Sequence, residues 1–462
     1  MQMTKRVLGA ALLLAVAATG PAAAADRDDG EARFSITGEA RVRAELVANV
    51  LDAQDHGVPA LDDEFSWFPY RGRIGARGLF ARNVVGYIEV QNFGFFGNDT
   101  PAESFSDPIG QGFKNSIDSS EVQLYQAYVE LGKLWGSSWG VSIGRREHTF
   151  ANELHMGDAD FYNGQTFDGI RATRDGEKWD LDVFMYQVTE NDLTSAVFGV
   201  PAIGAGDNDV TFSGAHATID LGRDGHSITP YLLFFRDGDF EVAGGKIYTL
   251  GAQYGKEAGD KGFDWNAEVA VQTGEFAPNG ADLDMRGNIV EGWFGYNWGG
   301  GDANNRAHIG VLRASGDDDL ADNDAEAFFP LFPDNHANNR LGDLDLFGGP
   351  TVVGLLTLDP ATGAIGITNV TDISLGYSRS WRDGKHDILA SLHLLSLTEQ
   401  PAALIDDEIG EEVDVVYDYR YTKVVSFQAG IANLVAGDAL DSAIGTNADD
   451  IMRAWGQVRL AW

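Results

Sequence analysis

Arginines recur at alternate positions in this chain, a spacing that places neighbouring cations on one face of an extended strand. Arg41 and Arg43 form one such pair, and Arg71 and Arg73 form another. The planar guanidinium group pairs well with carboxylates and stays charged at any relevant pH. Several arginines along one wall can therefore hold an anion weakly and repeatedly, as the conduction of a charged solute requires.

Further residues are expected on this polar surface because they lie at alternate positions of an expected strand or near its end. We expect it to include the cations Arg145, Arg171, Arg420 and Arg459 and the carboxylates Asp168, Glu412 and Asp414. Two interpretations remain open. In one, the arginines form a constriction for anions, and the acids set its geometry. In the other, the arginines pair with the acids, including Glu39 and Glu45, in a network that only stiffens the fold.

Little else in the sequence indicates a cofactor or catalysis. A run of carboxylates could bind Ca²⁺ weakly, but it lacks the turn glycine of an EF-hand and is more typical of a solvated loop; its members are Asp317, Asp319, Asp322 and Asp324. His148, His155 and His336 are expected to be surface residues of loops. No nucleophile elbow, zinc-protease motif or phosphate-binding loop occurs. We therefore predict a protein without cofactor that is not an enzyme, with an outer-membrane hydrolase as a remote alternative.

The elements that must position these residues are strands with one polar and one apolar face. In residues 33–45 the odd positions are polar and the even positions are apolar or small. Residues 263–273 and 412–422 repeat the alternation, whereas residues 386–396 alternate poorly and are placed only by spacing. Counting clear and weak segments gives about eighteen strands, within the range of bacterial outer-membrane barrels. We predict an all-β, antiparallel up-and-down transmembrane barrel.

The connections and the chain end agree with this fold class. Residues 47–65, 93–120, 315–370 and 399–411 are too long for hairpins and are expected to be extracellular loops, while the tight turn at 382–385 is expected to be periplasmic. The last strand alternates up to Trp462. A terminal aromatic residue resembles the signal that the outer-membrane assembly machinery recognises, although Phe is the commoner residue there.

The N-terminus has the features of an export signal. Lys5 and Arg6 precede an apolar stretch at 7–18, and small residues follow at 22–25. We expect residues 1–25 to be a secretory signal peptide and residues 26–462 to be one barrel. Cleavage changes the net charge from −37 to −39. A chain this acidic is not expected to bind nucleic acid or anionic lipid headgroups, and without cysteine it has no disulfides.

Several short motifs, in one order, resemble the alginate-export family of outer-membrane barrels. They are residues 143–146 (Ile-Gly-Arg-Arg), 157–158 (Gly-Asp), 163–171 (Asn-Gly-Gln-Thr-Phe-Asp-Gly-Ile-Arg), 314–317 (Ala-Ser-Gly-Asp), 329–333 (Phe-Pro-Leu-Phe-Pro), 410–414 (Gly-Glu-Glu-Val-Asp) and 419–421 (Tyr-Arg-Tyr). Two positions depart from the family pattern. Arg146 stands where the family often has Gln, and Gln165 stands where it often has Arg, which leaves the substrate less defined than the fold.

The resemblance implies a channel in the outer membrane of a Gram-negative bacterium. The expected cargo is an anionic polysaccharide such as alginate, passed outward with the help of periplasmic export partners. The alternative is a general or solute-specific porin that takes up small anions or sugars. Other expected partners are the outer-membrane lipid and the assembly machinery.

Overall fold

The structure is a computed structural model. It describes residues 32–50, 65–96, 122–160, 162, 164–189, 210–222, 225–237, 245–257, 261–276, 283–344, 346–347, 351–401, 404, 406–445 and 447–462. The predicted signal peptide at residues 1–25 lies outside these residues.

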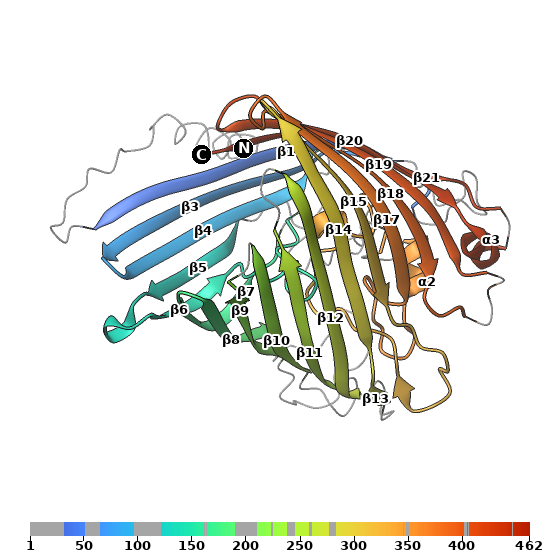
Figure 1. Ribbon diagram of the computed structural model, residues 1–462, viewed down its shortest axis with the longest axis horizontal. Helices are drawn as coiled ribbons and strands as arrows, with labels where there is room; N and C mark the ends of the chain where they lie inside the picture. The colour runs from blue at the N-terminus through green and yellow to red at the C-terminus, as the bar shows by residue number, and fades with distance from the viewer. Residues whose placement is uncertain are drawn as a thin grey trace, which may run out of the picture.

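Eighteen antiparallel strands of the described chain form a closed barrel in which each strand pairs with the next one along the chain (Figure 1). They are β1 (Arg33–Ala48), β3 (Pro69–Ala81), β4 (Val84–Phe95), β5 (Gln123–Leu131), β6 (Trp139–Arg146), β7 (Phe167–Arg174), β8 (Trp179–Thr189), β9 (Val210–Asp220), β10 (His226–Asp237), β11 (Gly245–Lys256), β12 (Gly262–Phe276), β14 (Asn288–Gly300), β15 (Ala303–Ala314), β17 (Val370–Trp381), β18 (His386–Leu397), β19 (Glu408–Arg420), β20 (Val425–Ala436) and β21 (Ile451–Ala461). The predicted fold class and strand number are confirmed.

Short elements decorate the connections. They are β2 (Phe65–Trp67), β13 (Leu283–Met285), β16 (Asp324–Ala325), α2 (Val352–Thr357), α3 (Asp438–Ile444) and the 3₁₀ turns Leu134–Gly136 and Ala337–Asn339. Among the described residues, no helix has the length and apolar character needed to cross a membrane.

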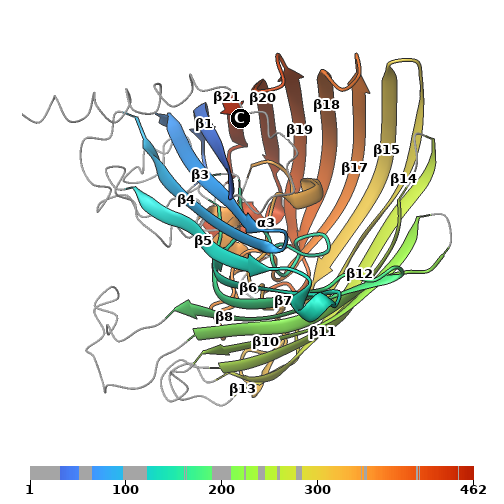
Figure 2. The same cartoon turned by 90° about the vertical axis from the view of Figure 1, so that its left-hand side faces the viewer.

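The barrel closes where β1 pairs with β21, which lie side by side in Figure 2. The antiparallel register runs from Glu39 opposite Ala461 to Ala48 opposite Met452. Just beyond it, the backbones of Gly38 and Trp462 exchange two hydrogen bonds, of 3.1 and 3.0 Å. The final residue is therefore part of the seam, so no sheet edge is left open there.

The alternation read from the sequence becomes an inner polar face and an outer apolar face. On β1, Arg41 and Arg43 are 7% and 4% exposed, whereas Val42 and Leu46 on the other face are 42% and 56% exposed. Burial of charges together with exposure of large apolar side chains is the reverse of a soluble protein. It fits strands whose outer face meets lipid, where a closed sheet satisfies every backbone hydrogen bond.

Long connections gather at one end of the barrel and short turns at the other, as predicted. Residues 51–64 and 97–121, from two predicted loops, lie outside the described chain. Two connections fold inward: residues 147–166 between β6 and β7, here called the inner connection, and residues 315–369 between β15 and β17, here called the large connection. They meet at a parallel bridge between Met156 and Phe332.

The apolar core of the molecule lies inside the barrel, near the long-connection end. Leu154 and Met156 of the inner connection are 1% and 0% exposed, and Phe328 of the large connection is 0% exposed. They pack in one cluster with inward side chains of the wall, including Tyr186 on β8 and Phe212 on β9. Apolar packing therefore holds both connections in the lumen and narrows it.

Candidate functional site

A cavity of about 250 Å³ lies inside the barrel against the seam. Three arginines line it, Arg41 and Arg43 from β1 and Arg459 from β21. The remaining lining residues are Asp160, His336, Asp343, Val416, Gln428, Trp455 and Gln457. The cavity thus combines cations and amides on the barrel wall with residues of the inner and large connections.

The three cavity arginines differ in how firmly they are held. Arg41 donates to the backbone oxygen of Asp160 at 2.7 Å and to that of Tyr162, so it fastens the inner connection to β1. Arg43 donates to Gln457 at 2.9 Å and pairs with Glu45 at 3.2 Å. Arg459 pairs with Glu39 at 2.7 Å, yet 46% of its side chain is exposed. Arg459 is therefore the cavity cation most open to a solute.

Arg71 and Arg73, on neighbouring β3, support the cavity from behind. Arg71 is 1% exposed and pairs with Glu39 at 2.7 Å and with Asp160 at 2.5 Å. Arg73 donates to Gln91 at 2.6 Å and lies 3.9 Å from the centre of the Tyr125 ring. Both guanidinium groups are buried and paired with side chains of the protein, which indicates a structural role.

Asp160 is the anionic centre on which this cluster converges. Arg71 and Arg73 both approach its Oδ1, at 2.5 and 3.3 Å. Burial alone would raise the pKa of Asp160, but the charges and hydrogen bonds of Arg71, followed by the charges of Arg73 and Arg41, lower it to about 2. Asp160 therefore stays ionised and fixes the tip of the inner connection against the arginines.

A second ion-pair group closes the cavity toward the long-connection end. Glu45, 1% exposed, accepts hydrogen bonds from Tyr162 at 2.9 Å and Trp67 at 2.5 Å. Arg453 of β21 approaches the same carboxylate at 3.1 Å. Glu39 and Glu45 are thus both paired with arginines, as the network interpretation expects, while the side chain of Arg459 remains half-exposed at the cavity.

Two predicted lumen residues occupy the opposite face of the wall. Arg145 on β6 and Asp168 on β7 form a two-pronged ion pair, with both contacts at 2.6 Å. Buried Ser142 and Phe167 lie on the inner face of these two strands. Arg145 and Asp168 lie instead on the same face as Ile143 and Ile170, which are 54% and 45% exposed. The structure therefore places this pair on the outer face near the long-connection end, which corrects its assignment to the pore lining.

Arg171 and Arg420 do lie on the inner face of the barrel wall, but away from the cavity. Arg171 donates its Nε to Asp182 on β8 at 2.6 Å. Arg420 lies at the short-turn end of β19, where its side chain is 65% exposed and 3.7 Å from Asp387. Neither residue lines the cavity.

Glu412 and Asp414 face inward from β19, and both are 0% exposed. Glu412 accepts a hydrogen bond from the backbone amide of Leu344 at 2.8 Å, which holds the large connection to the wall. Asp414 accepts from Ser391 at 3.2 Å and lies 3.6 Å from His393. This acidic wall is separate from the arginines of β1 and β3.

The acidic run of the large connection is organised mainly by local turns. Asp317 and Asp322 each accept a hydrogen bond from the amide two residues later, at 3.1 and 2.7 Å, as does Asp319. Asp324 pairs with Arg286. A carboxylate cluster does form within this segment, but it joins Asp317 to Asp318 and Glu326, so Asp319, Asp322 and Asp324 are not brought together with it.

Two histidines expected at the surface are buried inside the barrel, which corrects that expectation. His148 and His155 of the inner connection are 2% and 1% exposed. His148 Nδ1 lies 2.7 Å from the Tyr186 hydroxyl, and His155 Nε2 lies 2.9 Å from that of Tyr231. Burial lowers the pKa of His155 to about 3, so it remains neutral. The apolar Leu154 and Met156 beside it were the available signal that this segment is not a surface loop.

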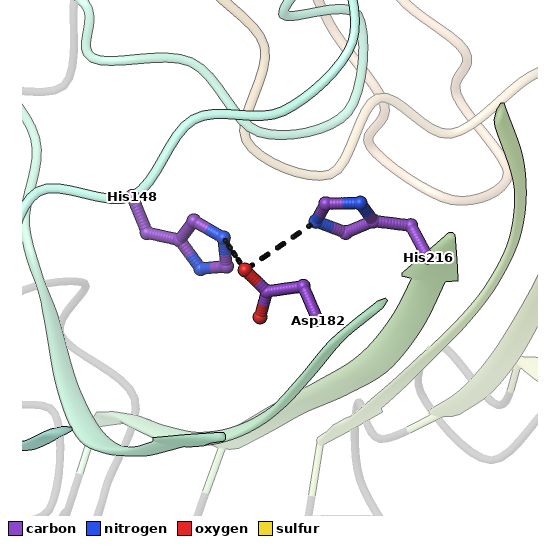
Figure 3. A group of neighbouring side chains, drawn as sticks. All are labelled: His148, Asp182 and His216. Carbon is purple, nitrogen blue, oxygen red and sulfur yellow. Dashed lines mark ion pairs between the residues drawn. The ribbon is translucent and has the colours of Figure 1, made fainter. Parts of the chain in front are cut away.

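His148 also belongs to a group that sequence reasoning missed altogether. Asp182 on β8 and His216 on β9 are partners across the two strands, and His148 approaches them from the inner connection (Figure 3). The Asp182 carboxylate lies 3.5 Å from His148 Nε2 and 3.8 Å from His216 Nε2. Because 34 residues separate Asp182 from each histidine, no local motif could indicate this group.

Comparisons with known proteins bear on both fold and family. A family model described as Alginate export matches residues 84–453. No curated protein sequence matches the chain.

Solved proteins of Pseudomonas aeruginosa share the fold. OccK11 (OpdR) is similar with a TM-score of 0.55 and 12% identity, covering 93% of this chain and 96% of that one. OpdK, solved with vanillate, gives 0.53 and 12%, covering 92% and 99%. OccK2 (OpdF), solved in complex with glucuronate, gives 0.51 and 12%, covering 93% and 97%. At this identity the likeness concerns the fold.

Proposed function

The chain belongs to the alginate-export family, and from that premise we propose that it passes an anionic polysaccharide such as alginate outward through its lumen. The protein is an outer-membrane channel of a Gram-negative bacterium. The finer proposal rests chiefly on the cavity at the seam, where three arginines face the lumen. We propose no catalytic step, since conduction needs only a path and weak binding.

The cavity has groups suited to each part of a sugar acid. Arg459, with nearly half of its side chain exposed, can pair with a carboxylate. Gln428 and Gln457 offer amides to hydroxyl groups, and Trp455 lines the same space. The arginines already have protein partners, so each solute contact replaces an existing one and stays weak. Weak contacts let successive carboxylates of a chain move past the same cations.

Uptake of small organic anions is the second candidate, and one observation favours it. Arg41 fastens the inner connection across the lumen, leaving a cavity of about 250 Å³, which suits a single small acid better than a polymer. OccK2 (OpdF) and OpdK, which share the fold, were solved with glucuronate and vanillate, two small compounds. Export through the same path requires the inner connection to move aside.

Planar-bilayer recordings test the proposal. The wild-type channel should be anion-selective, and uronate oligomers should block its current more strongly the longer they are. Arg459→Gln should reduce both the anion selectivity and the block. Arg420→Gln removes the same charge from the inner face at the short-turn end, away from the cavity, and should change them little.

The outcomes separate the two candidates. Block by monomeric uronate that does not grow with oligomer length would favour uptake of small anions over export. Cation selectivity of the wild type, or equal effects of Arg459→Gln and Arg420→Gln, would contradict a role for the seam arginines in either direction of transport.

The proposed partners follow from where the chain lies in the membrane. We propose that Trp462 forms part of the signal for the outer-membrane assembly machinery, since it ends the strand that closes the barrel. The apolar outer face contacts lipid. Periplasmic export proteins would meet the short-turn end, which also holds the C-terminus.

A further inference from the structure

Three potential metal ligands converge inside the barrel, away from the seam cavity (Figure 3). One ligand atom from each of His148, Asp182 and His216 lies within 4.8 Å of the other two. Ligands of a tetrahedral ion at about 2.0–2.1 Å are separated from one another by about 3.4 Å. Asp182 Oδ2 lies 3.5 Å from His148 Nε2 and 3.8 Å from His216 Nε2, close to that separation.

Three polar atoms at this point form no hydrogen bond among the described residues, whereas Asp182 Oδ2 is paired with Arg171. His148 Nε2, His216 Nε2 and Asp182 Oδ1 are buried and form no hydrogen bond there. Buried polar atoms are rarely left without a partner, because desolvation without a compensating bond is unfavourable. Three such atoms in one place therefore indicate a missing ligand that they share.

The surroundings of the two histidines fix their orientation. The Tyr186 hydroxyl lies 2.7 Å from His148 Nδ1, and accepting the Nδ1 proton would leave a lone pair on Nε2. The ring of Phe150 stacks on His216 at a centroid distance of 4.6 Å. Imidazoles held in a fixed orientation by their surroundings are typical of metal ligands.

We propose that His148, Asp182 and His216 bind a divalent transition-metal ion of the Zn²⁺ class. Two histidines and one carboxylate are nitrogen and oxygen donors that such ions accept, and they leave a further coordination position for water. Hard ions such as Ca²⁺ prefer six or more oxygen ligands, which this group does not offer.

Arg171 is the competitor that this site has to accommodate. Its Nε lies 2.6 Å from Asp182 Oδ2, the oxygen that also faces the histidines. The second oxygen, Oδ1, has no hydrogen-bond partner. An ion at Oδ2, the oxygen near the two histidines, therefore has to displace Arg171, for which Oδ1 remains as an acceptor. The positive charge of Arg171 weakens cation binding, so removing that charge should strengthen it.

The position of the site gives the ion a structural role. Asp182 and His216 belong to the wall, whereas His148 lies at the start of the inner connection, which carries Asp160 to Arg41 and Arg71. A bound ion would therefore fasten the inner connection to β8 and β9 on one side, while the arginines hold it on the other. Metal binding itself does not depend on which solute the channel conducts.

Titration calorimetry with Zn²⁺ tests the site, using full-length protein purified in detergent without a polyhistidine tag. One ion should bind per chain, and Co²⁺ should give the visible absorption of a tetrahedral nitrogen–oxygen site. His148→Ala and His216→Gln should each weaken Zn²⁺ binding by more than about 100-fold, since even second-shell losses cost about 10- to 100-fold. Arg171→Gln should tighten it.

His226→Ala is the matched control. His226 Nδ1 also lies 2.7 Å from a tyrosine hydroxyl, that of Tyr254, but it belongs to no metal-ligand group of the described chain. This variant should bind Zn²⁺ as the wild type does. The absence of saturable Zn²⁺ binding to the wild type would overturn the proposal. So would undiminished binding in folded His216→Gln, whose replaced side chain is only partly buried.

Discussion

At the scale of single residues, arginines of the same sequence pattern perform different tasks. Arg71 and Arg459 both pair with Glu39, but the Arg71 side chain is 0% exposed and that of Arg459 is 46% exposed. Removing one partner of a buried ion pair strongly destabilises the folded protein, whereas removing an exposed guanidinium changes the stability little. Burial, which the sequence does not show, therefore separates supporting arginines from those available to a solute.

Arg71→Gln tests the supporting role. The substitution leaves the buried Glu39 and the partly exposed Asp160 with fewer cations, so we expect the barrel to lose about 3–5 kcal/mol of unfolding free energy. Urea unfolding in lipid vesicles, followed by tryptophan fluorescence, measures the loss. Arg420→Gln, at a side chain 65% exposed, should shift the midpoint little. Equal shifts for the two variants would show that Arg71 does not hold the inner connection.

The pKa of Asp158, two residues from Asp160, is shifted in the opposite direction. Burial, followed by the charges of Asp160, Glu153 and Asp334, raises its pKa from 3.8 to about 7. The folded state thus binds the proton more tightly than the unfolded state does. The contribution of Asp158 to stability is greatest below pH 3.8 and is lost as the pH rises toward about 7.

This shift predicts the effect of Asp158→Asn. Between pH 3.8 and about 7, the melting temperature of the wild type in detergent should decline more than that of the variant, which has no carboxyl group to ionise. Melting curves at several pH values measure the difference. Parallel pH dependences would mean that Asp158 titrates normally.

At the scale of elements, strand alternation predicted the barrel, but not what fills it. The polar face of residues 33–45 was read correctly because every second residue is polar. Arg145 and Arg146 are adjacent, so alternation cannot say which faces inward, and the structure turns Arg145 outward. The inner connection was read as a loop because its buried residues follow no strand or helix period. Only contacts with strands distant in sequence place it in the lumen.

The parallel bridge between the two inward connections can be tested by cross-linking. Because the chain has no cysteine, Met156→Cys together with Phe332→Cys introduces the only possible disulfide. The two residues are bridge partners, a separation compatible with disulfide geometry. We expect oxidation to yield a faster-migrating band on a non-reducing gel, one that neither single variant gives. A double variant that stays reduced in folded barrels would contradict the inward packing of these connections.

At the scale of the whole molecule, closure depends on a close fit at the two ends of the chain. Gly38 pairs with Trp462 through the backbone, and a Cβ atom at Gly38 would lie 2.2 Å from Cζ2 of the indole ring. The sequence predicted that the last strand matters, but it could not show that its final residue lies over a glycine. That contact exists only because the first and last strands are neighbours in the closed sheet.

Gly38→Val should therefore lower the yield of folded barrel, because the added side chain collides with Trp462. Heat-modified migration on gels, after refolding into detergent, measures the folded fraction. Adding Trp462→Phe should restore part of the yield, since the smaller ring relieves the collision, and this rescue distinguishes crowding from a loss of the glycine itself. Normal folding of Gly38→Val would show that the seam tolerates a side chain there.

Because the cavity lies at this seam, it can form only when the barrel closes. Arg41 is synthesised near the start of the chain and Arg459 near its end, yet they are directly opposite each other in the finished sheet. Every intermediate with an open seam, and every truncated product, lacks this pair of neighbours and one wall of the cavity. The cavity is thus completed only at the closing step, when β21 pairs with β1.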